Sequence, residues 1–220
     1  MALTLRVLSV QVGQVAPVGG PGAPLASAID KRPVAGPVVV GPLGLAGDEV
    51  GHPEHHGGVD QAVLMCSAEA LRHLAPRFGR RLPPGSFGEN LTIEGSDEGD
   101  VRIGDVMRWG AVELEVASPR LPCHILARFL GHPDACAFVS APHRAGWYLR
   151  VTKPGTASAA DRLSIITRGD VAHTVERVAA VRADADDVAG ARALLGVPAL
   201  AASWKTYFAR RAAGSGAPGG

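Results

Sequence analysis

The segment Ser118-Pro119-Arg120-Leu121-Pro122-Cys123-His124 joins an alternating strand to a short apolar helix. Before it, apolar residues alternate with acidic ones over residues 112–116, which is typical of a strand with one buried face. After it, apolar residues recur at helical spacing over residues 125–130. Pro122 suits the first helical position because it has no N–H group to leave unpaired there. We therefore predict a strand, a turn and a helix, with Cys123 in the first helical turn.

Cys123 is the strongest candidate for chemistry in this segment. Free N–H groups and the helix dipole favour an anion in the first turn, so the pKa of the thiol should fall. Arg120 and, when protonated, His124 would act in the same direction. In the structural alternative, Cys123 is a buried free cysteine that packs as a small apolar residue. The local sequence leaves both interpretations open.

Composition describes an ordinary globular protein. With 220 residues, of which 46% are hydrophobic and 20% charged, the chain can bury one main domain with an appendage. A net charge of +1 gives no long-range field to attract a nucleic acid polymer or an anionic membrane. Three cysteines without a CxxC pair argue against a disulfide framework. The first ten residues carry Arg6 within their apolar run and resemble neither a signal peptide nor a spanning helix, so we expect a cytoplasmic protein.

Short strands dominate the first 168 residues. About eight are predicted, together with two short helices, of which one follows a Ser67 cap and the other follows Cys123. Residues 12–24 and 132–143 are predicted loops, and Gly104 marks a bulge or a close backbone approach. This pattern favours a mainly β protein, and we favour a barrel over a sandwich. The predicted strands cover residues 3–7, 38–40, 61–66, 91–93, 101–109, 112–116, 147–151 and 163–167.

A small helical appendage follows the barrel. Thr174 is predicted to cap a helix, and Asp186 or Asp187 to start a second that ends at Gly196. A third helix is marked by an aromatic stripe at helical spacing, which consists of Leu200, Trp204, Tyr207 and Phe208. We expect this stripe to pack rather than to bind a ligand. The predicted divisions are a barrel over 1–168, a three-helix extension over 169–212 and a disordered tail over 213–220.

The histidine-rich loop over residues 52–60 suggests a metal site. His52, His55 and His56 would need a further donor, such as Glu54 or Asp60. However, the spacing matches no standard zinc pattern, and the proline after His52 opposes a helix that presents the histidines together. A glycine-backed loop that hydrogen-bonds a ligand or its neighbours is the better interpretation.

Two roles remain open for a Cys123 thiolate. In a cysteine hydrolase, His56 or His124 would act as the base, and Asp60 or Asn90 would orient it. Alternatively, the soft thiolate would ligate a transition metal carried by a cofactor, held by polar loops. The sequence contains no P-loop, no GxGxxG after a strand and no HExxH, so nucleotide, dinucleotide and zinc-protease functions lose their usual support.

Five polar motifs follow one another along the chain: Gly44-Leu45-Ala46-Gly47-Asp48, His56-Gly57-Gly58-Val59-Asp60-Gln61-Ala62, Phe87-Gly88-Glu89-Asn90-Leu91, Ile103-Gly104-Asp105 and Ser118-Pro119-Arg120-Leu121-Pro122-Cys123. Each is weak alone, but their order is specific. Over about residues 27–167 they resemble the MOSC domain, the C-terminal domain of molybdenum cofactor sulfurases. The helical appendage resembles the three-helix extension of the YiiM-type bacterial members of that family.

This resemblance implies a barrel that binds the molybdenum cofactor, a molybdopterin whose metal Cys123 would ligate. It also implies an oxidoreductase, independent of pyridoxal phosphate, that reduces small N-hydroxylated bases or amines with two electrons and two protons. The chain lacks the Cx4CxxC run of a plant-type iron–sulfur domain, so a separate reductase would supply the electrons. We hypothesise that the appendage docks this reductase or closes the site. A molybdopterin or sulfur carrier without turnover is the alternative.

The same resemblance suggests the site residues. Cys123, His56 and Asp60 would be catalytic, and Lys31 and Arg120 would contact the cofactor phosphate through charge-assisted bonds. Structural alternatives stay open, because polar loop residues also hold turns and orient backbone N–H groups. The predicted cofactor-binding residues are Lys31, Asp48, His56, Gly57, Gly58, Glu89, Asn90, Asp105, Arg120 and Cys123.

Overall fold

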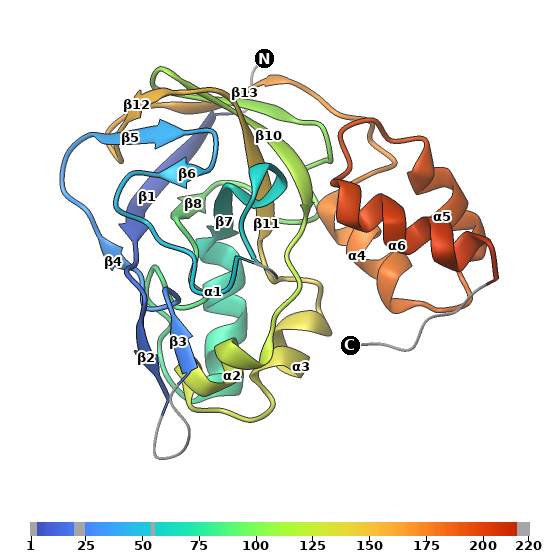
Figure 1. Cartoon of the computed structure of the whole chain (residues 1–220), viewed down its shortest axis with the longest axis horizontal. Coiled ribbons are helices and arrows are strands. Elements are labelled where there is room, and N and C mark those ends of the chain that lie inside the picture. The colour runs from blue at the N-terminus through green and yellow to red at the C-terminus, as the bar shows by residue number, and fades with distance from the viewer. Residues whose placement is uncertain (1–3, 20–24, 54–55, 215–220) are drawn as a thin grey trace.

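Seven strands close into a mixed β-barrel in the computed structural model, which describes residues 4–19, 25–53 and 56–214 (Figure 1). The strands are β1 (Thr4–Val12), β7 (Val63–Ser67), β8 (Leu91–Glu94), β9 (Val106–Trp109), β10 (Val112–Pro119), β11 (Trp147–Lys153) and β13 (Leu163–Thr167). They follow the order β13-β9-β10-β11-β7-β8-β1, and β1 pairs back with β13. β7 and β8 are parallel, while the other neighbours are antiparallel. The predicted barrel is confirmed.

Smaller elements surround the barrel. β4 (Arg32–Pro33) pairs with the end of β1. A hairpin of β2 (Ala16–Val18) and β3 (Leu25–Ser27) lies below β4 in Figure 1. β5 (Val38–Gly41), β6 (Gly44–Leu45) and β12 (Gly155–Ala157) form a separate sheet. The helices α1 (Ala68–Leu74), α2 (His124–Leu130) and α3 (Ala135–Ser140) gather at the lower end of the barrel. Short 3-10 helices span Val59–Gln61 and Ala75–Phe78.

The helix α1 forms as its sequence predicts. The Ser67 hydroxyl accepts a hydrogen bond from the Ala70 amide at 3.0 Å, which satisfies one of the unpaired donors of the first turn. Leu71 and Leu74 turn inward and are buried. They belong to a second apolar cluster, which α1, α2 and α3 share at this end of the barrel.

Three local predictions need correction. Residues 132–143 are not all loop, because α3 forms where Ala135 and Val139, four residues apart, are buried against the second cluster. The loop predicted over residues 12–24 contains β2. The strand predicted over residues 101–109 begins only at Val106, because Gly104 adopts a φ of 84°.

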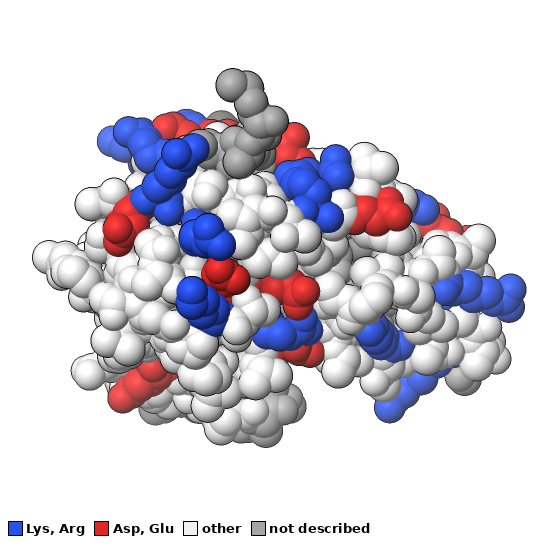
Figure 2. Space-filling model, turned by 90° about the horizontal axis from the view of Figure 1, so that it is seen from above, with Lys and Arg blue, Asp and Glu red and all other residues white. Residues whose placement is uncertain are grey.

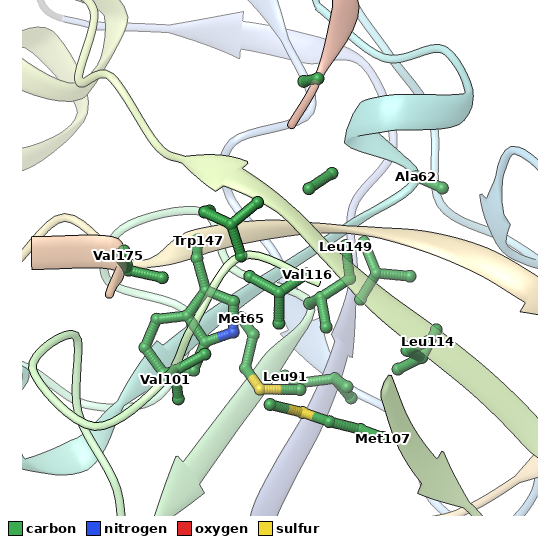
Figure 3. Close-up of a cluster of buried hydrophobic side chains, with 14 of the residues drawn as sticks. Ala62, Met65, Leu91, Val101, Met107, Leu114, Val116, Trp147, Leu149 and Val175 are labelled. Carbon is green, nitrogen blue, oxygen red and sulfur yellow. The ribbon is translucent and has the colours of Figure 1, made fainter. Parts of the chain in front are cut away.

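Apolar side chains fill the barrel interior, as alternation along the strands predicts. Figure 3 shows the Trp147 indole between Met65, Val101 and Val116, all of which are fully buried. Burial of this kind contributes about 25 cal/mol for each square ångström of apolar surface removed from water. The interior is therefore a packed core, and any ligand site has to lie at the barrel's ends or sides.

The C-terminal helices are α4 (Val175–Ala183), α5 (Val188–Leu195) and α6 (Ala202–Ala212), at the right of Figure 1. Thr174 caps α4 by accepting from the Arg177 amide at 3.1 Å, and Asp187 caps α5 by accepting from the Gly190 amide at 2.7 Å. The aromatic stripe packs, with Trp204 and Phe208 buried in the same cluster as the barrel core. Most of the predicted tail lies beyond Gly214, outside the described residues.

The surface carries charges of both signs. Figure 2 shows Lys and Arg side chains interspersed with Asp and Glu on the face seen from above, in keeping with the net charge of +1. Among the described helices, none has the length and apolar character needed to cross a bilayer.

Candidate functional site

A cleft of about 130 Å³ opens beside Cys123 at the end of the barrel. Segments that are far apart in the sequence meet in it, because β7, β8 and β10 bring their loops to one place. The polar residues that line it are Ser27, Lys31, Asp48, Glu49, His52, His56, Gln61, Asn90, Arg120, Cys123 and Tyr148. The structure thus brings together Cys123, His56, Gly57, Lys31, Asp48, Asn90 and Arg120 from the predicted site.

Cys123 lies one residue outside the helix rather than in its first turn. It is the N-cap of α2, with φ −112° and ψ 169°, and its carbonyl accepts from the Leu126 amide at 2.9 Å. Pro122 therefore precedes the cap, and the prediction that it occupies the first helical position is wrong. His124 takes that position, is exposed and does not line the cleft.

The surroundings of Cys123 favour its thiolate. Partial burial opposes ionisation, but a hydrogen bond from His56, the charge of Arg120 and the amides of Ile125 and Leu126 outweigh it and lower the pKa of Cys123 to about 7. About half of the sulfur is then ionised at neutral pH. Burial instead raises the pKa of Cys66 and Cys136, so Cys123 is the most acidic of the three thiols.

Arg120 is a buried cation with unused hydrogen-bonding capacity. The side chain is nearly enclosed, at 6% exposure, and its Nη2 donates to the Phe87 carbonyl at 3.2 Å. Its Nη1 has no hydrogen-bond partner among the described residues. A buried guanidinium nitrogen without a partner is costly, so it favours an anionic ligand in the cleft.

Lys31, Asp48 and Asn90 form a second polar group in the cleft. Lys31 and Asp48 make an ion pair, and Asp48 also accepts from the Gly13 amide at 2.7 Å and from Asn90 Nδ2 at 2.8 Å. Asn90 Oδ1 accepts from the Leu64 amide at 3.0 Å. These bonds fix loops from β1, β7 and β8 against one another and keep the Lys31 ammonium at the cleft wall.

The loop that carries His56 depends on glycine. Gly57 has a φ of 83°, and a Cβ added there would approach Val50 Cγ2 to 3.1 Å. The Gly57 amide donates to Gln61 Oε1 at 3.3 Å. Gly58, with a φ of 81°, is the N-cap of the 3-10 helix and does not line the cleft.

The histidine metal site finds no support in the described part of this loop. His52 and His56 both line the cleft, while Glu54 and His55 lie outside the described residues. Among the residues that are described, no group of three or more His, Cys, Asp or Glu side chains is arranged to hold a metal ion.

Three predicted carboxylates lie away from the cleft lining, where they hold backbone instead. Glu89 is fully buried and accepts from the amides of Gly85 and Phe87 at 2.7 and 2.9 Å, so it shapes the loop beside Arg120. Asp105 is fully buried and accepts from the Arg102 and Gly169 amides at 3.0 and 2.8 Å. Both match the structural alternative that the sequence left open.

Asp60, which was predicted to be catalytic, is the third carboxylate that lies away from the cleft lining. Its Oδ1 accepts from Nη2 and Nε of Arg150 at 2.6 and 2.9 Å, and its Oδ2 accepts from the Ala202 amide at 2.9 Å. The carboxylate therefore faces α6 and not the sulfur of Cys123. Gly104 makes the predicted close approach in the same region, since a Cβ there would lie 3.2 Å from that of Ala199.

Sequence reasoning missed Tyr148, which lines the cleft together with Arg120. Burial raises the pKa of its phenol, so it remains protonated near neutrality. The alternation of β11, whose Trp147 and Leu149 are buried inward, places Tyr148 on the opposite face. The alternation therefore predicts on which face of β11 Tyr148 lies, but not that this face lines the cleft. Cys136 was also missed, and its Sγ donates to the Cys123 carbonyl at 3.0 Å.

Comparison with known proteins identifies two family models along the chain. Residues 52–171 match the MOSC domain, and residues 174–214 match the YiiM-like, 3-alpha helix domain. Protein YiiM of Escherichia coli (strain K12) is 35% identical over 196 residues, which cover 86% of each chain. The crystal structure of YiiM from Geobacillus stearothermophilus matches with a TM-score of 0.80 and 30% identity, over 94% of this chain and 99% of that one.

A longer fungal protein is a more distant relative. It comes from Gibberella moniliformis (strain M3125 / FGSC 7600), carries the name "Reductase" and is 33% identical over 171 residues. The match covers 74% of this chain but 29% of that protein's length.

Proposed function

Since this chain belongs to the MOSC domain family and ends in the YiiM-like three-helix domain, we propose that its cleft binds the molybdenum cofactor, with Cys123 as the protein ligand of the metal. When bound, this cofactor supplies two-electron redox chemistry. The family's name links it to molybdenum cofactor sulfurases, and the cleft provides the residue types that such a group requires.

The acidic thiol of Cys123 carries this proposal. A soft thiolate suits a transition metal held by sulfur, and the pKa of about 7 makes the thiolate abundant at neutral pH. The unpartnered Nη1 of Arg120 lies in the same cleft and suits an anionic part of the ligand, such as a phosphate. The donor set therefore combines a soft ligand with a buried cation, which fits a phosphorylated pterin that carries a metal.

The proposed reaction is reduction of a small N-hydroxylated base or amine. A hydroxylamino group takes up two electrons and two protons, its N–O bond breaks, and the products are the amine and water. The relative named "Reductase" supports a redox role. The three cysteines are fewer than the four that a plant-type iron–sulfur cluster requires, so we propose a separate reductase as the electron donor.

The chain's own side chains would order the site around the substrate. His56 donates a hydrogen bond toward the Cys123 sulfur. Arg120 and Tyr148 both lie in the cleft wall, and burial keeps a proton on the Tyr148 phenol there near neutral pH. Glu89 keeps the loop that supplies the Phe87 carbonyl to Arg120 in place. These contacts fix the cation and the proton donors before any ligand enters.

The hydrolase alternative loses its orienting group. Asp60 is engaged by Arg150 and Ala202, and Asn90 by Leu64 and Asp48, so neither is free to orient His56. A carrier that binds molybdopterin without turnover remains the competing function, since fold alone does not determine activity.

Turnover separates the reductase from the carrier. The protein would be produced in a host that makes the cofactor, incubated with a hydroxylamino compound and dithionite, and assayed for the amine by chromatography. We expect amine formation with wild-type protein and with Cys136→Ser, and none with Cys123→Ser. Protein that contains molybdenum but forms no amine from any hydroxylamino compound would instead support the carrier.

A further inference from the structure

Two segments lead to the Cys123 cleft: the histidine arm, residues 56–61, and the cysteine arm, residues 117–123. Both are hydrogen-bonded to the start of α6. At the start of α6, the Ala202 amide donates to Asp60 Oδ2 at 2.9 Å. The neighbouring Ala201 amide donates to the Ala117 carbonyl at 2.9 Å. Two successive amides of one helix terminus therefore hold two segments that are far apart in the sequence.

These two segments are the ones that carry His56 and Cys123. Asp60 follows His56 on the same tight loop, in which the Gly57 amide donates to Gln61 Oε1. Ala117 lies on β10, which leads through Arg120 directly to Cys123. The start of α6 thus ties the histidine arm to the cysteine arm, and loss of either hydrogen bond would release one arm from the other.

Arg150 of β11 makes this attachment rigid. It donates two hydrogen bonds to Asp60 Oδ1, pairs with Glu115 of β10, and donates to the Ala199 carbonyl at 3.4 Å. A guanidinium shared between two carboxylates and a carbonyl has few orientations available. The Asp60 carboxylate is thereby held from both sides, by the barrel and by α6.

We propose that Asp60 is a positioning residue, and that the start of α6 sets the placement of His56 against Cys123 through it. The three-helix domain is then a structural part of the cleft, and a partner that displaces α6 would alter the site. This inference rests on the proposed function only in taking the Cys123 cleft as the functional site.

A proline at residue 202 tests the attachment selectively. Ala202 is the first residue of α6, where proline is well tolerated. Ala201 has φ −52° and ψ 142°, which is the conformation that a residue before proline adopts. Ala202→Pro therefore removes the N–H group that binds Asp60, and α6 should stay folded. Ala202→Ser keeps this N–H group and is the matched control.

Hydrogen–deuterium exchange gives the first measurement. In Ala202→Pro, we expect about tenfold faster exchange over residues 56–61 than in Ala202→Ser, with exchange in α1 unchanged. The His56 ring signals in an NMR spectrum, assigned with His56→Asn, should also move in the proline variant alone. Equal exchange over residues 56–61 with an unmoved His56 signal would overturn the proposal, as would a uniform rise across the chain.

A second pair of variants applies if the proline variant does not fold. Asp60→Ala should accelerate exchange over residues 56–61, while Asp187→Ala, which removes the cap of α5 instead, should leave that segment unchanged. The same response in both variants would contradict the proposal. These measurements need no cofactor, so an absence of molybdenum in the wild type would refute the proposed function and leave this test intact.

Discussion

Glu98 is a buried carboxyl group whose protonation should govern how stability depends on pH. Its side chain lies under the loop before β11, where its Oε1 accepts from the Gly146 amide at 2.9 Å. Its Oε2 has no hydrogen-bond partner within the described chain, and the residue is only 1% exposed. Burial raises the pKa of Glu98 from its ordinary 4.5 to about 7, despite the Gly146 amide and Arg144, which lower it.

The sign and size of the effect follow from this difference in pKa. Below pH 4.5, both folded and unfolded chains hold the proton, and between pH 4.5 and about 7 only the folded chain does. Stability therefore falls as pH rises through this window, by about 1.4 kcal/mol for each pH unit. The total loss is about 3 kcal/mol by pH 8.

Glu98→Gln removes the ionisable group and keeps an acceptor for the Gly146 amide. We expect it to match the wild type in free energy of unfolding at pH 4 and to exceed it by about 3 kcal/mol at pH 8. Urea titrations followed by tryptophan fluorescence would measure both values. Asp97→Asn is the control, because Arg144 and the amides of Gly99 and Asp100 outweigh burial and lower the pKa of Asp97. The difference in free energy of unfolding between Asp97→Asn and wild type, measured at pH 5 and 8, should therefore not change with pH. A difference between Glu98→Gln and wild type that is the same at both pH values would refute this reasoning.

Other predictions concern the thiol, a helix cap and the C-terminal core. In cofactor-free protein, the rate at which iodoacetamide modifies Cys123 should rise with a midpoint near pH 7, and His56→Asn should move that midpoint upward; an unchanged midpoint would exclude the hydrogen bond. Ser67→Ala should lower the free energy of unfolding by about 1 kcal/mol, and no loss would show that the cap contributes nothing. Phe208→Ala should cost about 3 to 5 kcal/mol in the same assay, whereas a loss below about 1 kcal/mol would mean that the stripe is not core.

The fold was predictable where side-chain period and capping residues act locally. Apolar alternation and short apolar runs between turns identified the seven barrel strands, and Ser67, Thr174 and Asp187 cap the helices expected of them. The parallel pairing of β7 with β8 has no local signal, because register depends on contacts between distant segments. The helix α3 was missed because tertiary packing, rather than a side-chain cap, stabilises it.

The site was predictable to the extent that chemistry restricts residue type. Cys123, Arg120 and His56 meet in the cleft as expected, because few other side chains supply a thiolate, a fixed cation and a hydrogen-bond donor. Carboxylate residues predicted the ligand site less well, because a carboxylate in a loop can accept from backbone amides as readily as it can bind a ligand. Glu89 and Asp105 both accept from backbone amides.

The molybdenum content of the purified protein tests the central claim most directly. The protein would be produced in a host that makes the cofactor, and metal per chain would be measured by mass spectrometry for wild type, Cys123→Ser and Cys136→Ser. We predict close to one molybdenum per chain in the wild type and in Cys136→Ser, and a loss of most of it in Cys123→Ser. Wild-type protein without molybdenum, or Cys123→Ser with as much as the wild type, would contradict Cys123 as the ligand.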